Sequence, residues 1–436
     1  MNISLIVARI NGLDGVALQV AEYANVLSEM GHKVKLIAGE DEKKIYGSPS
    51  YPENIETVIA DEMSLKNQNR IALYKGQFKG ENQMEEKEWE ALLEQSSNNV
   101  YESIMPLIQD SDAVFVYNFL ALRHYHPANA VGLQEVIKDS PAINFISHAA
   151  DPDSERPDVI ANLTDFAKRS LSCKNDYYSG GPVNYQNLSH IVLNPSQART
   201  FKEKHGIENV FTIPDIINAN IDRKKEDLSH IIDVLNNNQI SGEGNISEND
   251  TFFVSPVRPV RRKRLKEAME FMEKYNPEGV FIVTHPDGDD PEYASEIADY
   301  AKEKNLRYVY TGKDCTHNLL HNLYNGLSST KSIGVVASNA GGFENAILES
   351  MSYGIPVIVS NELNSYPILK EFGFKIGDGE FREFQGCSDY INDSFDESKR
   401  KYIAESNMKK LNMYFSRESA KEKIDSMLAK VGRRDN

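Results

Sequence analysis

The stretch Gly341–Ser360 reads GGFENAILESMSYGIPVIVS, and it predicts a glycine turn, a helix and a strand in succession. It follows the apolar run Ile333–Ala337, which is typical of a buried strand. Apolar residues recur at helical spacing between residues 344 and 353, Gly354 ends that helix, and Val357–Val359 begins the next strand. The helix N-terminus of such a βαβ unit points beyond the turn, where its free N–H groups favour an anion.

The order of residues in this stretch resembles the signature of glycosyltransferase family 4, which comprises retaining enzymes of the B-type fold. That signature is Glu-Gly-Phe-Gly, four variable residues, Glu-Ala-Met, a small residue, Gly, Pro and Val. The positions that match it are Gly342, Phe343, Glu349, Met351, Gly354, Pro356 and Val357. Two positions depart from it, because Gly341 replaces the first acid and Glu344 replaces the second glycine. An ordinary buried βαβ crossover is the alternative interpretation.

The composition excludes several classes of protein. A chain of 436 residues suits two domains, and its net charge of −17 argues against a nucleic-acid partner. No apolar stretch approaches the ~20 residues of a membrane span, so we expect no stable membrane insertion. The short N-terminal strand lacks the features of a signal peptide, and we expect a cytoplasmic protein. The cysteines, Cys173, Cys315 and Cys387, have neither disulfide-framework nor zinc spacing.

The alternation of strands and helices predicts an α/β protein with a doubly wound sheet in each half. The resemblance implies the B-type glycosyltransferase fold, with two Rossmann-like domains facing across a cleft. Residues 1–214 form the N-terminal, acceptor-side domain, and Ile213-Pro214-Asp215 resembles the Ile-Pro-Asn exit of the family. Residues 215–404 form the nucleotide-sugar-binding domain, and a C-terminal helix at 405–436 crosses back to the first domain.

The first strand, Ile3–Ala8, leads into a turn that contains Gly12 and Gly15. Gly15 and the later Gly31-His32-Lys33-Val34 occupy places that resemble the Gly-Gly-Val and Gly-His-x-Val of family 4, and the resemblance implies that Gly15 faces the donor diphosphate. A dinucleotide site with Glu40 as its ribose acid is the alternative, although its Gly-x-Gly-x-x-Gly motif is incomplete.

Arg258 and Lys263 stand at the spacing of the family's Arg-x4-Lys pair, between a predicted strand and a predicted helix. Cleavage of a sugar–diphosphate bond leaves extra charge on the diphosphate, and an Arg fork with a Lys point charge can hold it without a metal. The alternative is a solvated basic loop, which is our expectation for the neighbouring Arg261, Arg262 and Arg264.

The resemblance implies roles for the residues of the glycine turn and its helix. Glu349 holds the ribose hydroxyls of the donor, and amides near Gly342, Phe343 and Asn345 meet the diphosphate or the transferred sugar. The first acid of the family commonly contacts that sugar, and we expect Glu344 to replace it here; otherwise the site is weakened or specialised.

His148 and Asp151 follow a predicted strand, where family 4 members often carry a His near the reacting sugar. In a front-face retaining mechanism they orient sugar hydroxyls, and the leaving phosphate helps to deprotonate the acceptor. A loop His and a helix-capping Asp are the alternative. Asp287-Gly-Asp289-Asp290 lacks the remaining ligands of a calcium loop and is interpreted as a turn. We therefore predict no metal and no cofactor.

The resulting hypothesis is a retaining hexosyltransferase that moves a hexose from a GDP- or UDP-hexose to a hydroxyl acceptor, with a small soluble acceptor loosely favoured. One alternative is a nucleotide-sugar epimerase of the same architecture. The other is a non-catalytic glycosyltransferase-like subunit, which the replacement at Gly341 suggests. The oligomeric state is left open.

Overall fold

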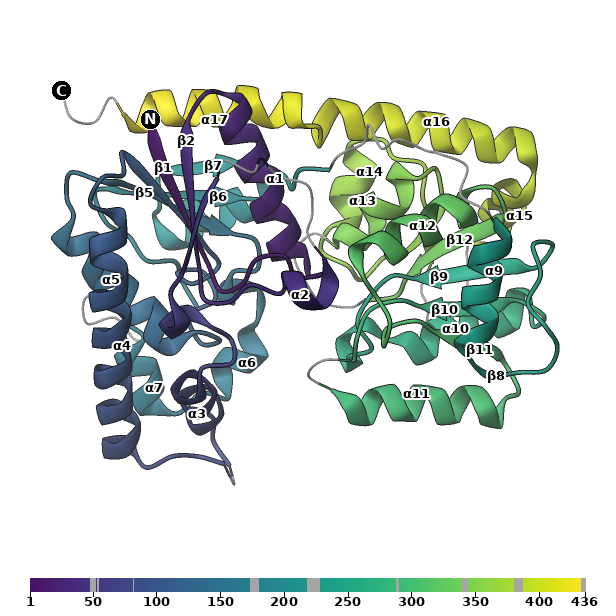
Figure 1. The fold of residues 1–436 in the computed structure, drawn as a ribbon, viewed down its shortest axis with the longest axis horizontal. Coiled ribbons are helices and arrows are strands. Elements are labelled where there is room, and N and C mark those ends of the chain that lie inside the picture. The colour runs from purple at the N-terminus through teal and green to yellow at the C-terminus, as the bar shows by residue number, and fades with distance from the viewer. Residues whose placement is uncertain are drawn as a thin grey trace. The chain divides into compact units, whose positions relative to one another are not determined.

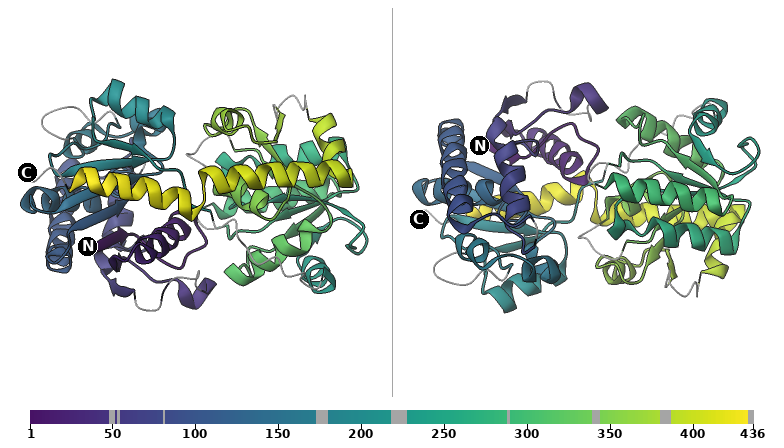
Figure 2. Two further views of the ribbon diagram at one scale, coloured as in Figure 1. Left: turned by 90° about the horizontal axis from the view of Figure 1, so that it is seen from above. Right: turned by 90° about the horizontal axis from the view of Figure 1, so that it is seen from below.

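The computed structural model describes residues 1–47, 52, 55–80, 82–172, 180–217, 228–287, 290–338, 344–379 and 387–432 (Figure 1). The chain divides into two compact units. Unit 1 is Met1–Ile216 together with Arg417–Asn436, and unit 2 is Ile217–Ser416. The sequence places the corresponding boundaries at residues 214 and 405. Each unit is a sheet with helices on both faces (Figure 2).

Unit 1 contains a parallel sheet of 7 strands in the order β3-β2-β1-β4-β5-β6-β7. The strands are β1 (Asn2–Val7), β2 (Lys33–Ala38), β3 (Glu56–Ile59), β4 (Ala113–Tyr117), β5 (Asn144–Ala149), β6 (Leu188–Val192) and β7 (Val210–Thr212). The order reverses between β1 and β4, so the topological switch point of this sheet lies at their carboxyl ends.

The helices of unit 1 are α1 (Gly15–Glu29), α2 (Lys43–Tyr46), α3 (Gln68–Gly76), α4 (Glu86–Ile108), α5 (Pro127–Asp139), α6 (Pro157–Ala161), α7 (Asp165–Ser170), α8 (Pro195–Arg199) and α17 (Arg417–Val431). Shorter turns are η1 (Asp61–Met63), η2 (Asp153–Glu155) and η3 (Thr200–Lys204). The C-terminal helix α17 packs beside α1, where Arg417 pairs with Glu22 at 2.6 Å (Figure 2). The last helix of the chain thus completes the N-terminal unit.

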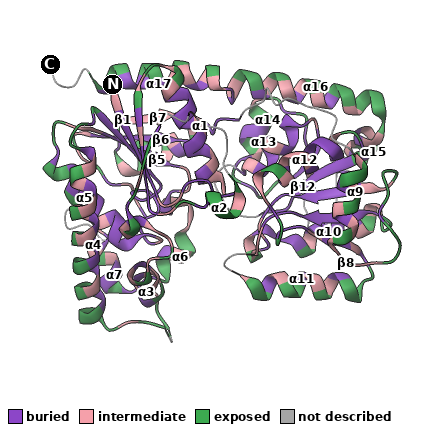
Figure 3. Ribbon diagram, in the orientation of Figure 1, coloured by how far each residue is buried: buried purple, intermediate pink, exposed green. Residues whose placement is uncertain are grey.

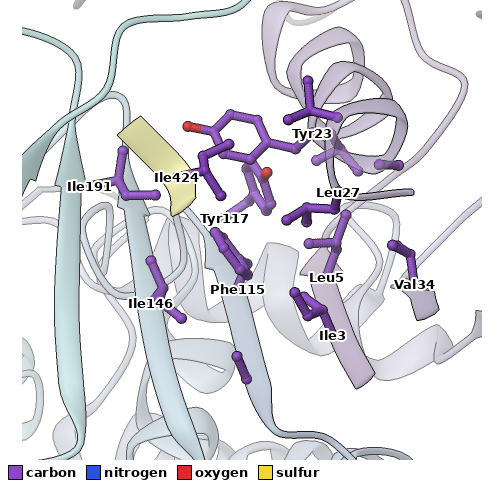
Figure 4. Packing of buried hydrophobic residues seen from close by; sticks show 14 of the residues in the cluster. Ile3, Leu5, Tyr23, Leu27, Val34, Phe115, Tyr117, Ile146, Ile191 and Ile424 are labelled. Atoms are coloured by element: carbon purple, nitrogen blue, oxygen red, sulfur yellow. The ribbon is translucent and has the colours of Figure 1, made fainter. Parts of the chain in front are cut away.

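The core of unit 1 joins the sheet to α1 and α17. Leu5 and Phe115 of adjacent strands pack with Tyr23 of α1 and Ile424 of α17 (Figure 4). The central strands are buried along almost their whole length (Figure 3). Helices cover both faces of such a sheet, so its strands are continuously apolar rather than alternating.

Unit 2 also contains a sheet of 7 strands, in the order β14-β13-β12-β9-β10-β11-β8, with β8 antiparallel to β11. Its strands are β8 (Gln239–Ser241), β9 (Thr251–Ser255), β10 (Val280–Val283), β11 (Arg307–Tyr310), β12 (Lys331–Val336), β13 (Val357–Ser360) and β14 (Gly377–Gly379). Here the order reverses between β9 and β12.

The helices of unit 2 are α9 (Leu228–Asn237), α10 (Leu265–Tyr275), α11 (Pro291–Glu303), α12 (His317–Ser328), α13 (Asn345–Ser352), α14 (Tyr366–Glu371), α15 (Ser388–Phe395) and α16 (Glu397–Tyr414), with the turn η4 (Arg261–Lys263). The strand–helix–strand order predicted around residues 333–360 is confirmed by β12, α13 and β13. Gly354 follows the helix with φ 78°, a conformation that favours glycine. Among the described helices, none is both long and apolar enough to span a membrane.

Candidate functional site

The switch point of unit 2 brings two loops to one edge of the sheet. β9 leads into residues 256–264 and β12 leads into residues 337–344, and the two strands are directly paired, with Ile333 opposite Phe253. Where the strand order reverses, the connections that follow two neighbouring strands run to opposite faces of the sheet. This leaves a crevice at the carboxyl ends of the strands, where α/β proteins bind ligands. Arg258 and Lys263 of the first loop and Glu344 at the end of the second therefore belong to one region.

Three charged residues meet in this region. The Lys263 ammonium donates to the Glu344 carboxylate, and the Arg262 guanidinium lies 3.5 Å from the other carboxylate oxygen. Lys263 and Glu344 are 6% and 8% exposed. A buried pair of this kind is stable only as a pair, because either charge alone would lack both water and a partner.

Glu344 immediately precedes α13 and has an extended backbone, with φ −78° and ψ 101°. Its side chain makes no capping hydrogen bond to the helix among the described contacts. The carboxylate contacts Lys263 instead, so helix capping does not explain this residue. Asn345 is the first residue of the helix. Gly341, Gly342 and Phe343, the other residues of the predicted turn, lie outside the described residues.

The three arginines expected to be solvated differ in their surroundings, and Arg262 lies near Glu344 as described above. Arg261 is exposed and pairs with Glu296 at 2.9 Å, as a solvated residue would. Arg264 is buried and pairs with Glu362 at 2.7 Å, so the prediction of a solvated Arg264 is wrong. Local sequence does not reveal this difference, because Glu362 follows β13, far along the chain. Arg258 is half-buried in the same loop.

Glu349 lies on α13 with partners that differ from those of Glu344. Its carboxylate accepts a hydrogen bond of 3.5 Å from the Tyr324 hydroxyl, and burial raises its pKa to about 7. The Tyr324 ring stacks on Tyr353 at 4.8 Å, and Tyr353 is hydrogen-bonded to His321 at 2.7 Å. The two acids of the helix thus contact different groups, as their spacing of five residues predicts.

Gly15 of unit 1 is the first residue of α1. The Asp14 side chain caps this helix by accepting from the Val16 N–H at 3.1 Å, and it pairs with Arg9 at 2.7 Å. Asp14 stands where family 4 usually has a glycine, and its charge is balanced locally. Glu40, the ribose acid of the alternative dinucleotide site, pairs with Lys66 at 2.5 Å.

His148 lies near the end of β5 and is only 1% exposed. Its ring stacks on Tyr117 at 4.7 Å and meets the edge of Tyr23 at 5.2 Å. Burial lowers its pKa to about 3, so the ring is neutral at pH 7. Within the described structure neither ring nitrogen has a hydrogen-bond partner. Sequence reasoning did not identify Tyr23 or Tyr117 as site residues. In the sequence they occupy apolar positions of a helix and a strand and give no other signal.

Asp151 lies in the loop after β5, 3.8 Å from Arg156. The η2 turn that follows begins after Pro152, so Asp151 is not its cap. Glu155, which sequence reasoning missed, accepts from the Gln197 side chain at 2.9 Å. Burial, with a smaller contribution from Asp151, raises the pKa of Glu155 to about 7. An acid soon after a strand end is the only sequence signal for it.

Two histidines that follow β4, His124 and His126, are buried. The His124 ring is hydrogen-bonded to Asp153 at 2.5 Å, and burial lowers the pKa of His126 well below its usual value. Asp290 caps α11 by accepting from the Tyr293 N–H at 3.1 Å, whereas Asp289 lies outside the described residues. Across the described ranges, no three His, Cys, Asp or Glu side chains form a metal-binding group.

Comparisons with known proteins agree with this architecture. No family model matches the chain. The mannosylglucosylglycerate synthase of Petrotoga mobilis is 26% identical over 407 residues, with 86% of each chain covered. The enzyme of the same name from Thermotoga maritima is 23% identical over 407 residues, which covers 88% of this chain and 86% of that protein. These similarities extend over both units.

Among solved structures, Anabaena Alr3699/HepE in complex with UDP and glucose superposes with a TM-score of 0.63 at 12% identity. The match covers 99% of this chain and 100% of that one, so the fold is shared throughout. The predicted fold class is confirmed, and both sequence relatives are named as synthases. The chain is a glycosyltransferase of the B-type fold.

Proposed function

We propose that this enzyme is a retaining hexosyltransferase that uses a nucleoside-diphosphate hexose and a small hydroxylated acceptor. The observation that carries the proposal is the meeting of Lys263 and Glu344 at the switch point of unit 2. A cation for the diphosphate and an acid for the sugar lie side by side there, at the start of a helix. The proposal assigns these two groups to the two halves of the donor.

Lys263 and Arg258 bind the donor diphosphate in this proposal. Departure of the diphosphate from the sugar concentrates negative charge on its terminal phosphate, and a positioned ammonium and guanidinium stabilise that charge. The N-terminus of α13 adds its dipole and the amide of Asn345. The roles of Gly342 and Phe343 remain those that the family signature implies.

Glu344 changes partner when the donor arrives. Before binding, its carboxylate neutralises Lys263. The diphosphate then supplies negative charge to Lys263, and the carboxylate is available to accept hydrogen bonds from hydroxyls of the transferred hexose. Arg262, 3.5 Å away, keeps the carboxylate near the cations during the exchange. Glu344 thus takes the role of the acid that Gly341 replaces.

Glu349 receives the ribose of the donor. The residue is half-buried, and its carboxylate accepts a hydrogen bond of 3.5 Å from Tyr324. Paired ribose hydroxyls would supply two further donors and favour the ionised form, which burial alone disfavours. This gives the nucleotide half of the donor a binding group of its own.

Unit 1 contributes Gly15, His148 and Asp151. Because His148 is neutral at pH 7, it acts by orienting sugar hydroxyls and not as a cation or a nucleophile. Gly15 offers the N-terminus of α1 to the diphosphate, and Asp151 orients hydroxyls with His148. In a front-face reaction the leaving phosphate accepts the proton of the acceptor hydroxyl as the new bond forms on the same face.

The names of the relatives guide the choice of substrates. Two are synthases of mannosylglucosylglycerate, and a protein of the same fold is known with UDP and glucose. We therefore take a mannosyl or glucosyl nucleotide as donor and a glycerate glycoside as acceptor. Cys315 and Cys387 are free thiols, which is consistent with the cytoplasm as the proposed location.

The test combines binding and turnover. Melting temperature is measured with UDP, GDP and ADP, because only a bound nucleotide stabilises the fold. The stabilising base is then supplied as its mannose and glucose derivatives, with and without glucosylglycerate. We expect acceptor-dependent product whose one-bond C1–H1 coupling shows the same anomeric configuration as that of the donor. Free sugar formed equally without acceptor would support the epimerase alternative, and an inverted product would overturn the retaining assignment.

A further inference from the structure

Arg264 has an unusual backbone conformation for a non-glycine residue. It ends the η4 turn and also precedes α10, with φ 52° and ψ 46°, in the left-handed region. Residues other than glycine adopt this region rarely, and they persist there only when surrounding contacts hold them. At Arg264 those contacts come from its own side chain.

The Arg264 guanidinium bridges two carboxylates from different parts of unit 2. Its Nε lies 3.1 Å from Glu267, in the first turn of α10, and its Nη1 lies 2.7 Å from Glu362, after β13. The residue is 4% exposed. In the sheet β12 stands between β9 and β13, so this side chain links the exits of the two strands on either side of it.

The remaining amino group of the guanidinium, Nη2, differs from Nε and Nη1 because it has no carboxylate partner among the described residues. The Nη2 atom is buried, and in the part of the chain that the structure describes it makes no hydrogen bond. Buried N–H groups of a cation are nearly always paired, so this unpaired one calls for an explanation. The preceding residue in the chain is Lys263.

We propose that Arg264 is a positioning residue, which holds Lys263 in place for the donor diphosphate. This inference rests on the proposed donor role of Lys263. The left-handed turn sets the direction in which the chain presents Lys263, and the two ion pairs keep that turn in place. Two carboxylates in different directions need the planar fork of an arginine, which the point charge of a lysine cannot replace.

The experiment compares Arg264→Gly and Arg264→Lys with the unaltered enzyme. Glycine adopts the left-handed conformation without strain, so Arg264→Gly removes the side chain and both of its ion pairs without making the turn itself unfavourable. We expect kcat to fall by about a hundredfold, the order expected when a catalytic group is displaced by about 1 Å. Arg264→Lys keeps the charge and should not restore turnover. Arg261→Gln is the matched control, because Arg261 is exposed in the same loop, and its kcat should stay unchanged.

A second measurement follows Lys263 itself. Its rate of acylation by an amine-reactive reagent is read by mass spectrometry, relative to that of the exposed Lys302, well below the melting temperature. The rate should rise severalfold in Arg264→Gly, and less in Glu362→Gln, which removes one of the two bridging charges. A lower melting temperature with unchanged kcat and unchanged Lys263 reactivity would mean a purely structural role and would overturn the proposal. If the unaltered enzyme shows no donor turnover but Lys263 still becomes reactive, the proposed function fails and the positioning role stands.

Discussion

Lys263 and Glu344 form a buried ion pair although 81 positions separate them in the chain. The pair places the cation assigned to the diphosphate in contact with the acid assigned to the sugar. A bound diphosphate and the Glu344 carboxylate therefore compete for one ammonium group. This competition makes specific predictions for variants at either residue.

Glu344→Ala should lower turnover strongly and leave nucleoside diphosphate binding intact or tighter. Loss of the carboxylate leaves Lys263 buried without this partner, which typically costs about 3–5 kcal/mol of stability. A bound diphosphate replaces the missing charge, so it should raise the melting temperature more in the variant than in the unaltered enzyme. Calorimetry, melting curves and initial rates measure the three quantities. Glu296→Ala, which removes the partner of exposed Arg261, is the control, and unchanged turnover in Glu344→Ala would sink the sugar-contact role.

Arg258→Ala and Lys263→Ala should each reduce donor use by on the order of a hundredfold or more, because loss of one positioned charge costs a few kcal/mol in such sites. Lys263→Ala should also lower the melting temperature, since Glu344 then keeps only Arg262 as a described cationic partner. Initial rates over a range of donor concentrations separate donor KM from kcat. Near-normal rates in both variants, with Arg261→Ala as reference, would remove the diphosphate assignment.

Donor binding should weaken at acidic pH through Glu349. Burial raises its pKa from 4.5 to about 7, and ribose hydroxyls bind the ionised form. Affinity for a nucleotide sugar without acceptor should therefore fall below pH 7 and approach a tenfold loss per pH unit. A nucleotide sugar is used because its diphosphate has no terminal phosphate that titrates in this range. Glu349→Gln should bind more weakly, with this dependence removed.

The same pKa shift has the opposite effect on stability without ligand. A carboxyl whose pKa is raised on folding binds its proton more tightly in the folded protein. Its contribution to the free energy of unfolding is therefore complete below pH 4.5 and is lost as the pH rises through about 7. Chemical denaturation of the unaltered protein and of Glu349→Gln between these pH values measures that contribution. A parallel pH dependence in the two proteins would contradict the assignment of the shift to Glu349.

Turnover should persist after dialysis against a chelator, because cationic side chains and a helix N-terminus carry out the charge stabilisation in the proposed mechanism. Rates are measured before and after dialysis, and again with added magnesium or manganese. The variant Asp290→Ala tests the same point by removing one carboxylate of residues 287–290, whose described role is to cap α11. It should cost about 1 kcal/mol of stability without loss of turnover. Activity that disappears with the chelator and returns with the metal would restore a metal role for residues 287–290.

The pattern around Gly341–Ser360 sufficed to predict a strand, a helix and a second strand, because apolar spacing and the stops at Gly354 and Pro356 are local signals. The assignment of Lys263 and Glu344 to one donor site followed from the resemblance to family 4, whereas the structure shows that the strands before them, β9 and β12, are neighbours. The contact between Lys263 and Glu344 could not be predicted. The family signature assigns Lys263 to the diphosphate and has a glycine at the position of Glu344. No nearby sequence feature indicates that the two side chains pair.

By itself, the sequence determined the order of strands and helices, the B-type fold through its resemblance to family 4, and the residue types of the donor site. Only the tertiary structure decided which charged side chains form pairs and which side chains are buried. Arg264 and Glu362 pair across 98 positions, and His148 is buried between two tyrosines from different elements. The physical reason is that burial and charge pairing depend on neighbours across the sheet. Local sequence encodes backbone conformation and apolar periodicity, but it does not specify which distant side chain occupies the space beside a given residue.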